Sequence, residues 1–192
     1  MPSIDWEAKY HAGTTGWERP GLNPAFTAWR ADGTLAPCRI LLPGAGRSPE
    51  PLAFAEAGFD VTVVDLAPSA IAAQRARFAA AGRPATLVEA DLLEWGPERP
   101  FDAVYDQTCL CALPPALHAA YVGRLSTWLR PGSHLHILFM QTGRPEGPPF
   151  DCPIDQMRAL FPSIAWNWPV SLPDPVPHPA GFIEQPAVLR RV

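Results

Sequence analysis

Two glycines and one aspartate stand where the sequence predicts the ends of neighbouring strands. Gly44 and Gly46 follow the apolar run 39–43, and Asp65 closes the next β-rich run, 60–65. Glycine lets a backbone turn tightly and approach a ligand, and a carboxylate at the next strand end can accept hydrogen bonds from both hydroxyls of a ribose. These residues predict a site for an adenosine-containing cofactor. The alternative is a plain strand-to-helix turn, in which Gly-x-Gly is also common.

Pro49 distinguishes between the possible cofactors. In the dinucleotide-binding pattern a third glycine would stand at this position. Proline removes one of the helix-end amides that bind a pyrophosphate. S-adenosylmethionine has no phosphate, so the proline favours it over a nicotinamide dinucleotide. An NAD(P)-dependent oxidoreductase with a Rossmann fold is the competing interpretation, because it would share the glycine turn and Asp65.

Polar residues also follow the third and fourth predicted strands. Asp91 and Leu92 come just after the run 86–89, and Gln107 follows the run 102–106. Ligands of open α/β sheets collect at the carboxyl ends of the strands, which makes Gln107 a candidate site residue. Asp91 could accept a hydrogen bond from the adenine amino group while Leu92 packs on the ring. A turn-forming aspartate is an equally good interpretation of Asp91 alone.

Three aromatic residues precede the first predicted strand. Trp6, Tyr10 and Trp17 lie in a segment that glycines interrupt. A sulfonium over an aromatic face gains cation–π energy of about 0.5 to 2 kcal/mol, so we expect this segment to fold over the cofactor. Trp6 and Tyr10 are also spaced as neighbours on one helix face, and packing of that helix on the core is the alternative. Trp17 lies in a glycine loop, which favours a functional role.

The chain from residue 39 alternates β-rich and helical runs, the pattern of a parallel sheet flanked by helices. The expected strands are 39–43, 60–65, 86–89, 102–106 and 134–140, with two more at 164–170 and 182–190. The last two are close in sequence, whereas a parallel crossover needs a dozen or more residues, so we expect them to be antiparallel. The predicted fold class is α/β, a doubly wound, Rossmann-like, mostly parallel seven-stranded sheet with an antiparallel C-terminal strand pair.

Length and composition predict one domain. The 192 residues are 47% hydrophobic and 18% charged, which suits a folded chain with a single core. Within the domain 1–192 we expect an N-terminal aromatic lid segment (1–36), a cofactor-binding core (37–141), and a substrate loop with a C-terminal hairpin (142–192). This small core needs no partner subunit, so we expect a monomer.

Charge and cysteine usage exclude several classes of partner. The formal net charge is -4 and no Lys/Arg cluster occurs, which argues against nucleic acid and favours a small-molecule substrate. The four cysteines match no zinc-site spacing, so no metal is expected. No apolar stretch approaches the roughly 18 residues of a membrane span and no signal peptide is evident, so we expect a cytoplasmic protein without membrane contact.

With these motifs, the chain resembles the thiopurine methyltransferase family, which also contains thiol, halide and thiocyanate methyltransferases. The matching stretches cover nearly the whole chain and are Trp6 with Tyr10, Gly13–Trp17, Leu42–Gly46, Asp106–Thr108 with Cys111–Pro115, and Gly147–Phe150. The resemblance implies that S-adenosylmethionine is the cofactor. It also implies cofactor contacts from Trp6, Tyr10, Trp17, Gly44, Asp65, Asp91, Leu92 and Gln107; the glycine turn adds Gly46.

The chain departs from the family at two positions that bear on the methyl acceptor. Gln107 stands where thiopurine-type members carry Arg and halide-type members carry Tyr, and Tyr10 stands where many members have Trp. The acceptor therefore cannot be copied from either branch. By analogy, the stretch 147–150 forms part of a substrate lid, although Phe150 in a rigid loop packed on the core is the other interpretation.

Methyl transfer to a soft nucleophile needs little acid–base chemistry. A thiol, thione, chalcogen, halide or thiocyanate anion already offers a lone pair, so orientation in a dry pocket can supply most of the rate. We expect Trp17, Gln107 and Phe150 to shape that pocket and no residue to be required as a base. His118, His134 and His136 are expected to be structural. A protein that only binds or sequesters a small ligand is the non-enzymatic alternative.

Overall fold

The computed structural model describes residues 4–192, which build one eight-stranded sheet. Its main path is β3 (Thr86–Glu89), β2 (Asp60–Asp65), β1 (Arg39–Pro43), β4 (Phe101–Gln107), β5 (Leu129–Gln141), β8 (Ile183–Arg191) and β6 (Trp166–Asn167). The first five strands are parallel, β8 is antiparallel to β5, and β6 is antiparallel to β8. The two-residue strand β7 (Val176–Pro177) also pairs with β8. The predicted doubly wound, seven-strand arrangement is confirmed, with β7 as an addition.

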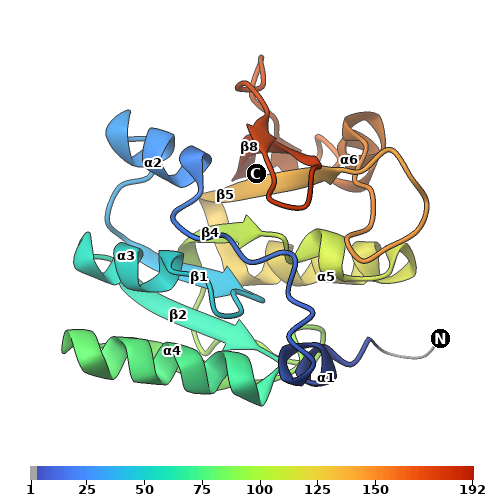
Figure 1. Ribbon diagram of the computed structural model, residues 1–192. Helices are drawn as coiled ribbons and strands as arrows, with labels where there is room; N and C mark the ends of the chain where they lie inside the picture. Colours follow the sequence, from blue (N-terminus) through green and yellow to red (C-terminus); the bar gives the residue numbers. More distant parts are fainter. Residues whose placement is uncertain (1–3) are drawn as a thin grey trace.

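Helices cover both faces of the sheet (Figure 1). One face packs under α2 (Pro24–Ala31), α3 (Glu50–Glu56) and α4 (Pro68–Ala81), which bury Phe26, Phe54 and Phe78. The other face packs under α5 (Pro115–Trp128) and α6 (Ile154–Leu160). Because β1 and β2 carry apolar residues on both faces, their side chains enter both cores, as expected of buried parallel strands.

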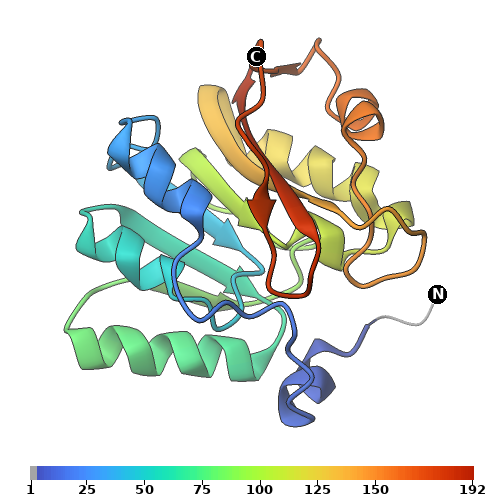
Figure 2. The same cartoon turned by 45° about the horizontal axis from the view of Figure 1, so that its top comes forward.

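The N-terminal segment crosses the end of the sheet where β1 and β2 finish (Figures 1 and 2). Helix α1 (Trp6–His11) starts at Asp5, whose carboxylate accepts a hydrogen bond from the Ala8 amide. It then packs against α4, with Tyr10 buried beside Ala67 and Ala70. The carboxyl ends of the parallel strands are therefore covered by a segment that comes from the start of the chain.

Besides β7 and the earlier start of β5 at Leu129, two elements differ from the sequence prediction. The strand expected over 164–170 is reduced to β6, because only Trp166 is buried while Ile164 and Val170 are exposed. Trp168 instead stacks on Phe139 of β5, with 5.6 Å between the ring centroids, so its ring packs on a side chain of the sheet and does not extend the strand. The prediction also missed α2.

Helix α2 did carry a local start signal. Asn23 caps its first turn, accepting a hydrogen bond from the Ala25 amide, and Pro24 occupies the first position of the helix. No helix among residues 4–192 is both long and apolar enough to cross a bilayer.

Candidate functional site

The turn after β1 favours glycine at two positions. Gly44 and Gly46 have φ of 55° and 56°, in the left-handed region that L side chains rarely adopt. A Cβ on Gly46 would lie 2.5 Å from the Tyr10 hydroxyl oxygen, and one on Gly44 would lie 2.9 Å from the Cys109 sulfur. The turn is thus enclosed by the N-terminal helix on one side and by the segment after β4 on the other.

Asp65 holds the glycine turn against the end of β2. One carboxylate oxygen accepts from the Gly46 amide at 2.8 Å, and the other accepts from the Ala67 amide at 2.9 Å. Burial raises the pKa of Asp65, and the backbone hydrogen bonds from Ala67 and Gly46 oppose that rise. A carboxylate oxygen can accept more than one hydrogen bond, so both retain capacity for a donor such as a ribose hydroxyl. The glycine turn and Asp65 therefore fit an adenosyl group.

Two adjoining cavities lie at this end of the sheet. The larger has a volume of about 480 Å³ and the smaller about 300 Å³. Trp17, Gly44 and Thr108 line both of them, so the two spaces meet beside the glycine turn. A ligand that spans both cavities would pass under the Trp17 side chain.

The larger cavity has two sides, because the sheet order places β2 and β3 opposite β5 and β8 relative to β1. Residues after β2 and β3 line one side: Asp65, Leu66, Asp91 and Leu92. Residues from β5, the loop 142–153 and the segment before β8 line the other: Met140, Arg144, Pro148, Pro149, His178 and Phe182. We call these the β2 side and the β5 side. The β2 side carries carboxylates and the β5 side is mostly apolar.

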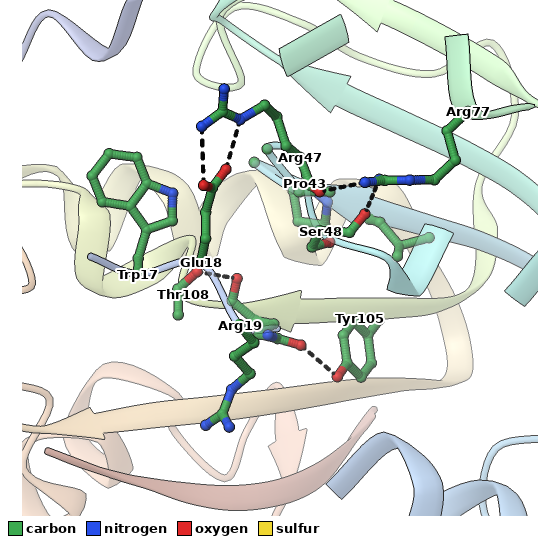
Figure 3. Close-up of a pocket in the computed structure, with 14 residues that line it drawn as sticks. Trp17, Glu18, Arg19, Pro43, Arg47, Ser48, Arg77, Tyr105 and Thr108 are labelled. Carbon is green, nitrogen blue, oxygen red and sulfur yellow. Dashed lines mark hydrogen bonds and ion pairs between the residues drawn. The ribbon is translucent and has the colours of Figure 1, made fainter. Parts of the chain in front are cut away.

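The smaller cavity is lined by charged and polar groups (Figure 3). Arg47 donates two hydrogen bonds to the Glu18 carboxylate, at 2.7 and 2.9 Å. Arg77 donates to the carbonyl oxygens of Ser48 and Arg47, which fixes the backbone just after the glycine turn. Charged groups of both signs make this cavity suitable for a zwitterionic ligand such as an amino acid.

Gln107 is oriented by its neighbour on the same face of β4. The Tyr105 hydroxyl donates to the Gln107 side-chain oxygen at 2.8 Å. The amide nitrogen of Gln107 is then the group left to donate to a ligand in the smaller cavity. Gln107 therefore presents a hydrogen-bond donor beside the glycine turn.

Asp106 supports the site from below and does not line either cavity. It accepts hydrogen bonds from the Cys109 and Leu110 amides and from the Tyr121 hydroxyl. Burial raises the pKa of Asp106 to about 6, against the effect of those hydrogen bonds. The carboxyl group thereby anchors the turn that begins at Thr108, whose φ of 65° is unusual for a β-branched residue.

The aromatic residues of the N-terminal segment form one cluster above the cavities. The Trp17 ring packs edge-on against Trp6 at 5.4 Å and against Tyr10 at 5.7 Å between centroids. All three line the larger cavity. Packing of the helix on the core and lining of the cavity are therefore not exclusive for Trp6 and Tyr10, because their rings pack α1 against the rest of the molecule and also face the cavity.

The structure gathers the predicted site residues with one exception. All nine candidate cofactor residues line one cavity or both: Trp6, Tyr10, Trp17, Gly44, Gly46, Asp65, Asp91, Leu92 and Gln107. Phe150 lines neither. Its amide donates to the Cys111 carbonyl at 2.7 Å, which ties residue 150 to the turn after β4 and leaves Pro148 and Pro149 facing the cavity.

The predicted structural histidines lie away from the cavities. The His118 ring bonds the Leu113 carbonyl at 2.9 Å, and His136 is buried against Trp29. Arg19, Arg144 and His178 are among the lining residues that sequence reasoning missed. All three lie in irregular segments rich in proline and glycine, where no periodic pattern marks a residue as facing a site.

Known proteins resemble this chain in both sequence and structure. The model of the Thiopurine S-methyltransferase family matches residues 1–171. A solved structure, 1,6-didemethyltoxoflavin-N1-methyltransferase from Burkholderia thailandensis with bound S-adenosylhomocysteine, superposes with a TM-score of 0.77 and 24% identity. The match covers 98% of this chain and 86% of that one, and it shows a shared fold.

Curated relatives are more similar in sequence. Thiopurine S-methyltransferase of Pseudomonas fluorescens is 31% identical, over 84% of this chain and 82% of its own length. A probable thiol methyltransferase of Arabidopsis thaliana is 26% identical, over 81% of this chain and 70% of its own length. With the family match over most of its length and this site at the carboxyl ends of its strands, the chain belongs to the thiopurine S-methyltransferase family of S-adenosylmethionine-dependent methyltransferases.

Proposed function

We propose that this enzyme transfers a methyl group from S-adenosylmethionine to a small soft nucleophile: a thiol, a thione, or a chalcogen, halide or thiocyanate anion. The observation that carries the proposal is the meeting of the two cavities at Trp17, Gly44 and Thr108. The names of relatives that act on thiols, thiocyanate and thiopurines support the acceptor class.

The two cavities suggest how the cofactor is held. Asp65 would accept the ribose hydroxyls, and Asp91 with Leu92 would hold the adenine on the β2 side of the larger cavity. The amino acid tail would lie in the smaller cavity, where the Glu18–Arg47 pair and the Gln107 amide offer groups for its two charges. When bound, the cofactor supplies a sulfonium methyl: the acceptor lone pair forms the new bond to the methyl carbon as the carbon–sulfur bond breaks, leaving its electron pair on the neutral thioether.

The chain itself would act by orientation and by exclusion of water. Trp6, Tyr10 and Trp17 close the cavities from above, and the Trp17 ring offers a face to a cation at their junction. Apolar residues on the β5 side keep the acceptor desolvated, which strengthens its nucleophilicity. The acceptor would be positioned by Gln107, Pro148 and Pro149. The two prolines take the role that the sequence analysis gave to Phe150.

The nicotinamide-dependent alternative is not supported, because the family match and the similar structures with known ligands are those of methyltransferases. We further propose one domain over 1–192, with residues 1–36 as lid, 37–141 as cofactor-binding core and 142–192 as substrate loop and C-terminal hairpin. We also propose a cytoplasmic monomer that does not bind nucleic acid, in keeping with the net charge of -4.

Calorimetry and an acceptor panel test this proposal. S-adenosylhomocysteine should bind the purified protein and NADH should not, and labelled S-adenosylmethionine should transfer its methyl group to at least one thiol or soft anion. Absence of uptake of either form of the methyl donor would overturn the assignment. Binding without transfer to any acceptor would favour the non-catalytic alternative.

Trp17 offers the sharpest single-residue test of the site. We expect Trp17→Ala to lower kcat/KM at least about tenfold, because it removes the ring shared by both cavities. Trp17→Phe keeps an aromatic face and should retain most of the rate. Equal rates for wild type and Trp17→Ala would remove this residue from the site.

A further inference from the structure

Thr108 lies at the point where the two cavities meet. Of the described residues that line both cavities, Trp17 and Thr108 carry side chains and Gly44 does not. The Trp17 indole can only donate a hydrogen bond, so the Thr108 hydroxyl is the one acceptor oxygen on a shared side chain. This oxygen lies beside whichever part of a ligand passes from one cavity into the other.

The hydroxyl proton of Thr108 is already used within the chain. The hydroxyl donates it to the Gln107 carbonyl oxygen at 2.6 Å (Figure 3). A hydroxyl has one proton and two lone pairs, so the lone pairs are what remains for a ligand. Thr108 can therefore attract positive charge, but it has no proton left to donate to an anionic group.

The backbone at Thr108 is strained. Among residues 4–192 it is the one residue other than glycine with a positive φ, 65°, which is costly for a β-branched side chain. Asp106 holds the next turn by accepting from the Cys109 and Leu110 amides. The Cys111 thiol donates to the Thr108 carbonyl oxygen at 3.4 Å. Strain that surrounding contacts impose in this way is concentrated at functional sites, so the threonine points to a use for its side chain.

The charge on the sulfur is what distinguishes the two forms of the cofactor at this junction. S-adenosylmethionine carries a positive sulfonium, whereas S-adenosylhomocysteine carries a neutral thioether. The carbons bonded to a sulfonium are electron-poor, so their C–H groups donate to an oxygen better than those of the neutral product. We propose that Thr108 is a specificity-determining residue whose hydroxyl oxygen holds the sulfonium and so selects the methyl donor over its demethylated product. This inference rests on the proposed function, because it takes the sulfonium to lie beneath Trp17 at the junction.

The consequence for the enzyme is weaker product inhibition. When the methyl group leaves, the sulfur becomes neutral and the product loses an attraction that the methyl donor had. The Trp17 ring acts in the same direction, because an aromatic face also attracts a cation. The contacts proposed for the adenosine and the amino acid tail are common to both forms. Discrimination between them is therefore expected from the residues at the junction.

Calorimetry of both cofactor forms with variants of Thr108 tests the assignment. Thr108→Val keeps the branched shape and removes the oxygen, so we expect the Kd of S-adenosylmethionine to rise about two- to fivefold. The Kd of S-adenosylhomocysteine should change by less than about 1.5-fold, because its sulfur carries no charge. Thr108→Ser keeps the oxygen and should retain most of the wild-type preference, defined as the ratio of the two Kd values.

Thr127 provides the control substitution. It is exposed on α5 and lines neither cavity, and its hydroxyl also donates to a backbone carbonyl, that of Arg124 at 2.8 Å. Thr127→Val therefore removes a hydroxyl from the same kind of hydrogen bond and should leave both Kd values unchanged. A wild-type ratio in Thr108→Val, or an equal shift of the ratio in Thr127→Val, would overturn the assignment.

Thr108→Gly separates a role in the site from a role in folding. Glycine adopts the left-handed backbone without strain, so we expect the melting temperature to rise by about 2 to 4 °C. The same variant should lose the preference for S-adenosylmethionine as Thr108→Val does. A lower melting temperature together with an unchanged preference would assign Thr108 to folding alone and overturn the inference.

Binding and turnover together separate this inference from the proposed function. If Thr108→Val loses the preference but the wild-type protein methylates no thiol or soft anion, methyl transfer to soft nucleophiles is wrong and the Thr108 assignment stands. If the methyl group is transferred and Thr108→Val keeps the wild-type preference, the function stands and the Thr108 assignment is wrong.

Discussion

Gly46 lies directly beneath the Tyr10 hydroxyl, so its missing side chain is part of how the lid closes. The distance from a hypothetical Cβ to that oxygen is 2.5 Å, and the backbone is in the left-handed region. We expect Gly46→Ala to lower the free energy of unfolding by about 1 to 3 kcal/mol and to weaken binding of S-adenosylhomocysteine. Urea unfolding and calorimetry measure the two effects.

Gly123, in the middle of α5, is the matched control for this substitution. No atom lies within 4 Å of a Cβ built there, and its φ is not positive. Gly123→Ala should therefore stabilise the protein by roughly 0.5 to 1 kcal/mol through helix propensity. If Gly46→Ala stabilised the protein as Gly123→Ala does, the Tyr10 hydroxyl would not lie as close to residue 46 as the structure places it.

Polar contacts of Glu7, Glu18 and Arg19 help to attach the N-terminal segment to the rest of the molecule. Glu7 accepts hydrogen bonds from the Ser69 amide and hydroxyl at the start of α4. Glu18 pairs with Arg47 beside the glycine turn. Arg19 points the opposite way (Figure 3) and pairs at 2.6 Å with Glu184 on β8, whose side chain is fully buried. The segment is thus held at α4, at the cofactor turn and at the C-terminal strand.

The Glu18–Arg47 pair should affect cofactor exchange more than stability. Both side chains are about one-third exposed, so Glu18→Gln should cost less than about 1 kcal/mol of unfolding free energy. The same substitution loosens the segment over both cavities, and we expect release of S-adenosylhomocysteine to accelerate severalfold. Stopped-flow measurement of the protein's intrinsic tryptophan fluorescence follows the release.

Asp60 offers the comparison for the lid pair. It makes exposed pairs with Arg39 and Arg99 at the start of β2, at the opposite end of the strand from Asp65. Asp60→Asn should leave the release rate unchanged. Equal release rates for wild type and Glu18→Gln would show that this contact does not control the lid.

The whole molecule should lose stability in mild acid through His136. This side chain is buried on β5, and neither ring nitrogen has a hydrogen-bond partner among the described residues. Burial, with a contribution from His134, lowers the pKa of His136 to about 4, whereas an unfolded histidine titrates near 6.5. Between those values the unfolded chain binds more protons, so unfolding becomes more favourable as the pH falls from about 6.5 toward 4.

Replacing this histidine isolates its contribution. His136→Leu should be as stable as wild type or more stable at pH 7, because an unpartnered buried polar group is removed. Its unfolding free energy should also fall less steeply than that of wild type between pH 6.5 and 4.5, measured by urea unfolding. His11→Gln, at a site whose side chain is 73% exposed, should keep the wild-type slope. Parallel slopes for wild type and His136→Leu would contradict the assignment.

The nucleotide half of the molecule was predictable because its signals are local. Residues that line the cavities stand at or just after the ends of β1, β2, β3 and β4, and parallel pairing brings those ends to one edge of the sheet. Gly44, Gly46, Asp65, Asp91 and Gln107 could therefore be placed at one edge of a sheet from sequence alone. The predicted bounds of a strand were less accurate where tertiary packing decides how long it is. The strand expected over 164–170, for example, is only Trp166–Asn167 in the structure.

By itself, the sequence determined the fold class, the cofactor edge and the aromatic segment that covers it. Only the tertiary structure decided that β8 inserts between β5 and β6, which brings His178 and Phe182 to the wall where Arg144 lies. It also decided that Phe150 turns out of the lining while two prolines enter it. The physical reason is the sequence separation of the contacts. Strand ends are encoded by residues that are neighbours in the chain, whereas the β5 side is assembled from distant segments whose contacts follow no periodic pattern.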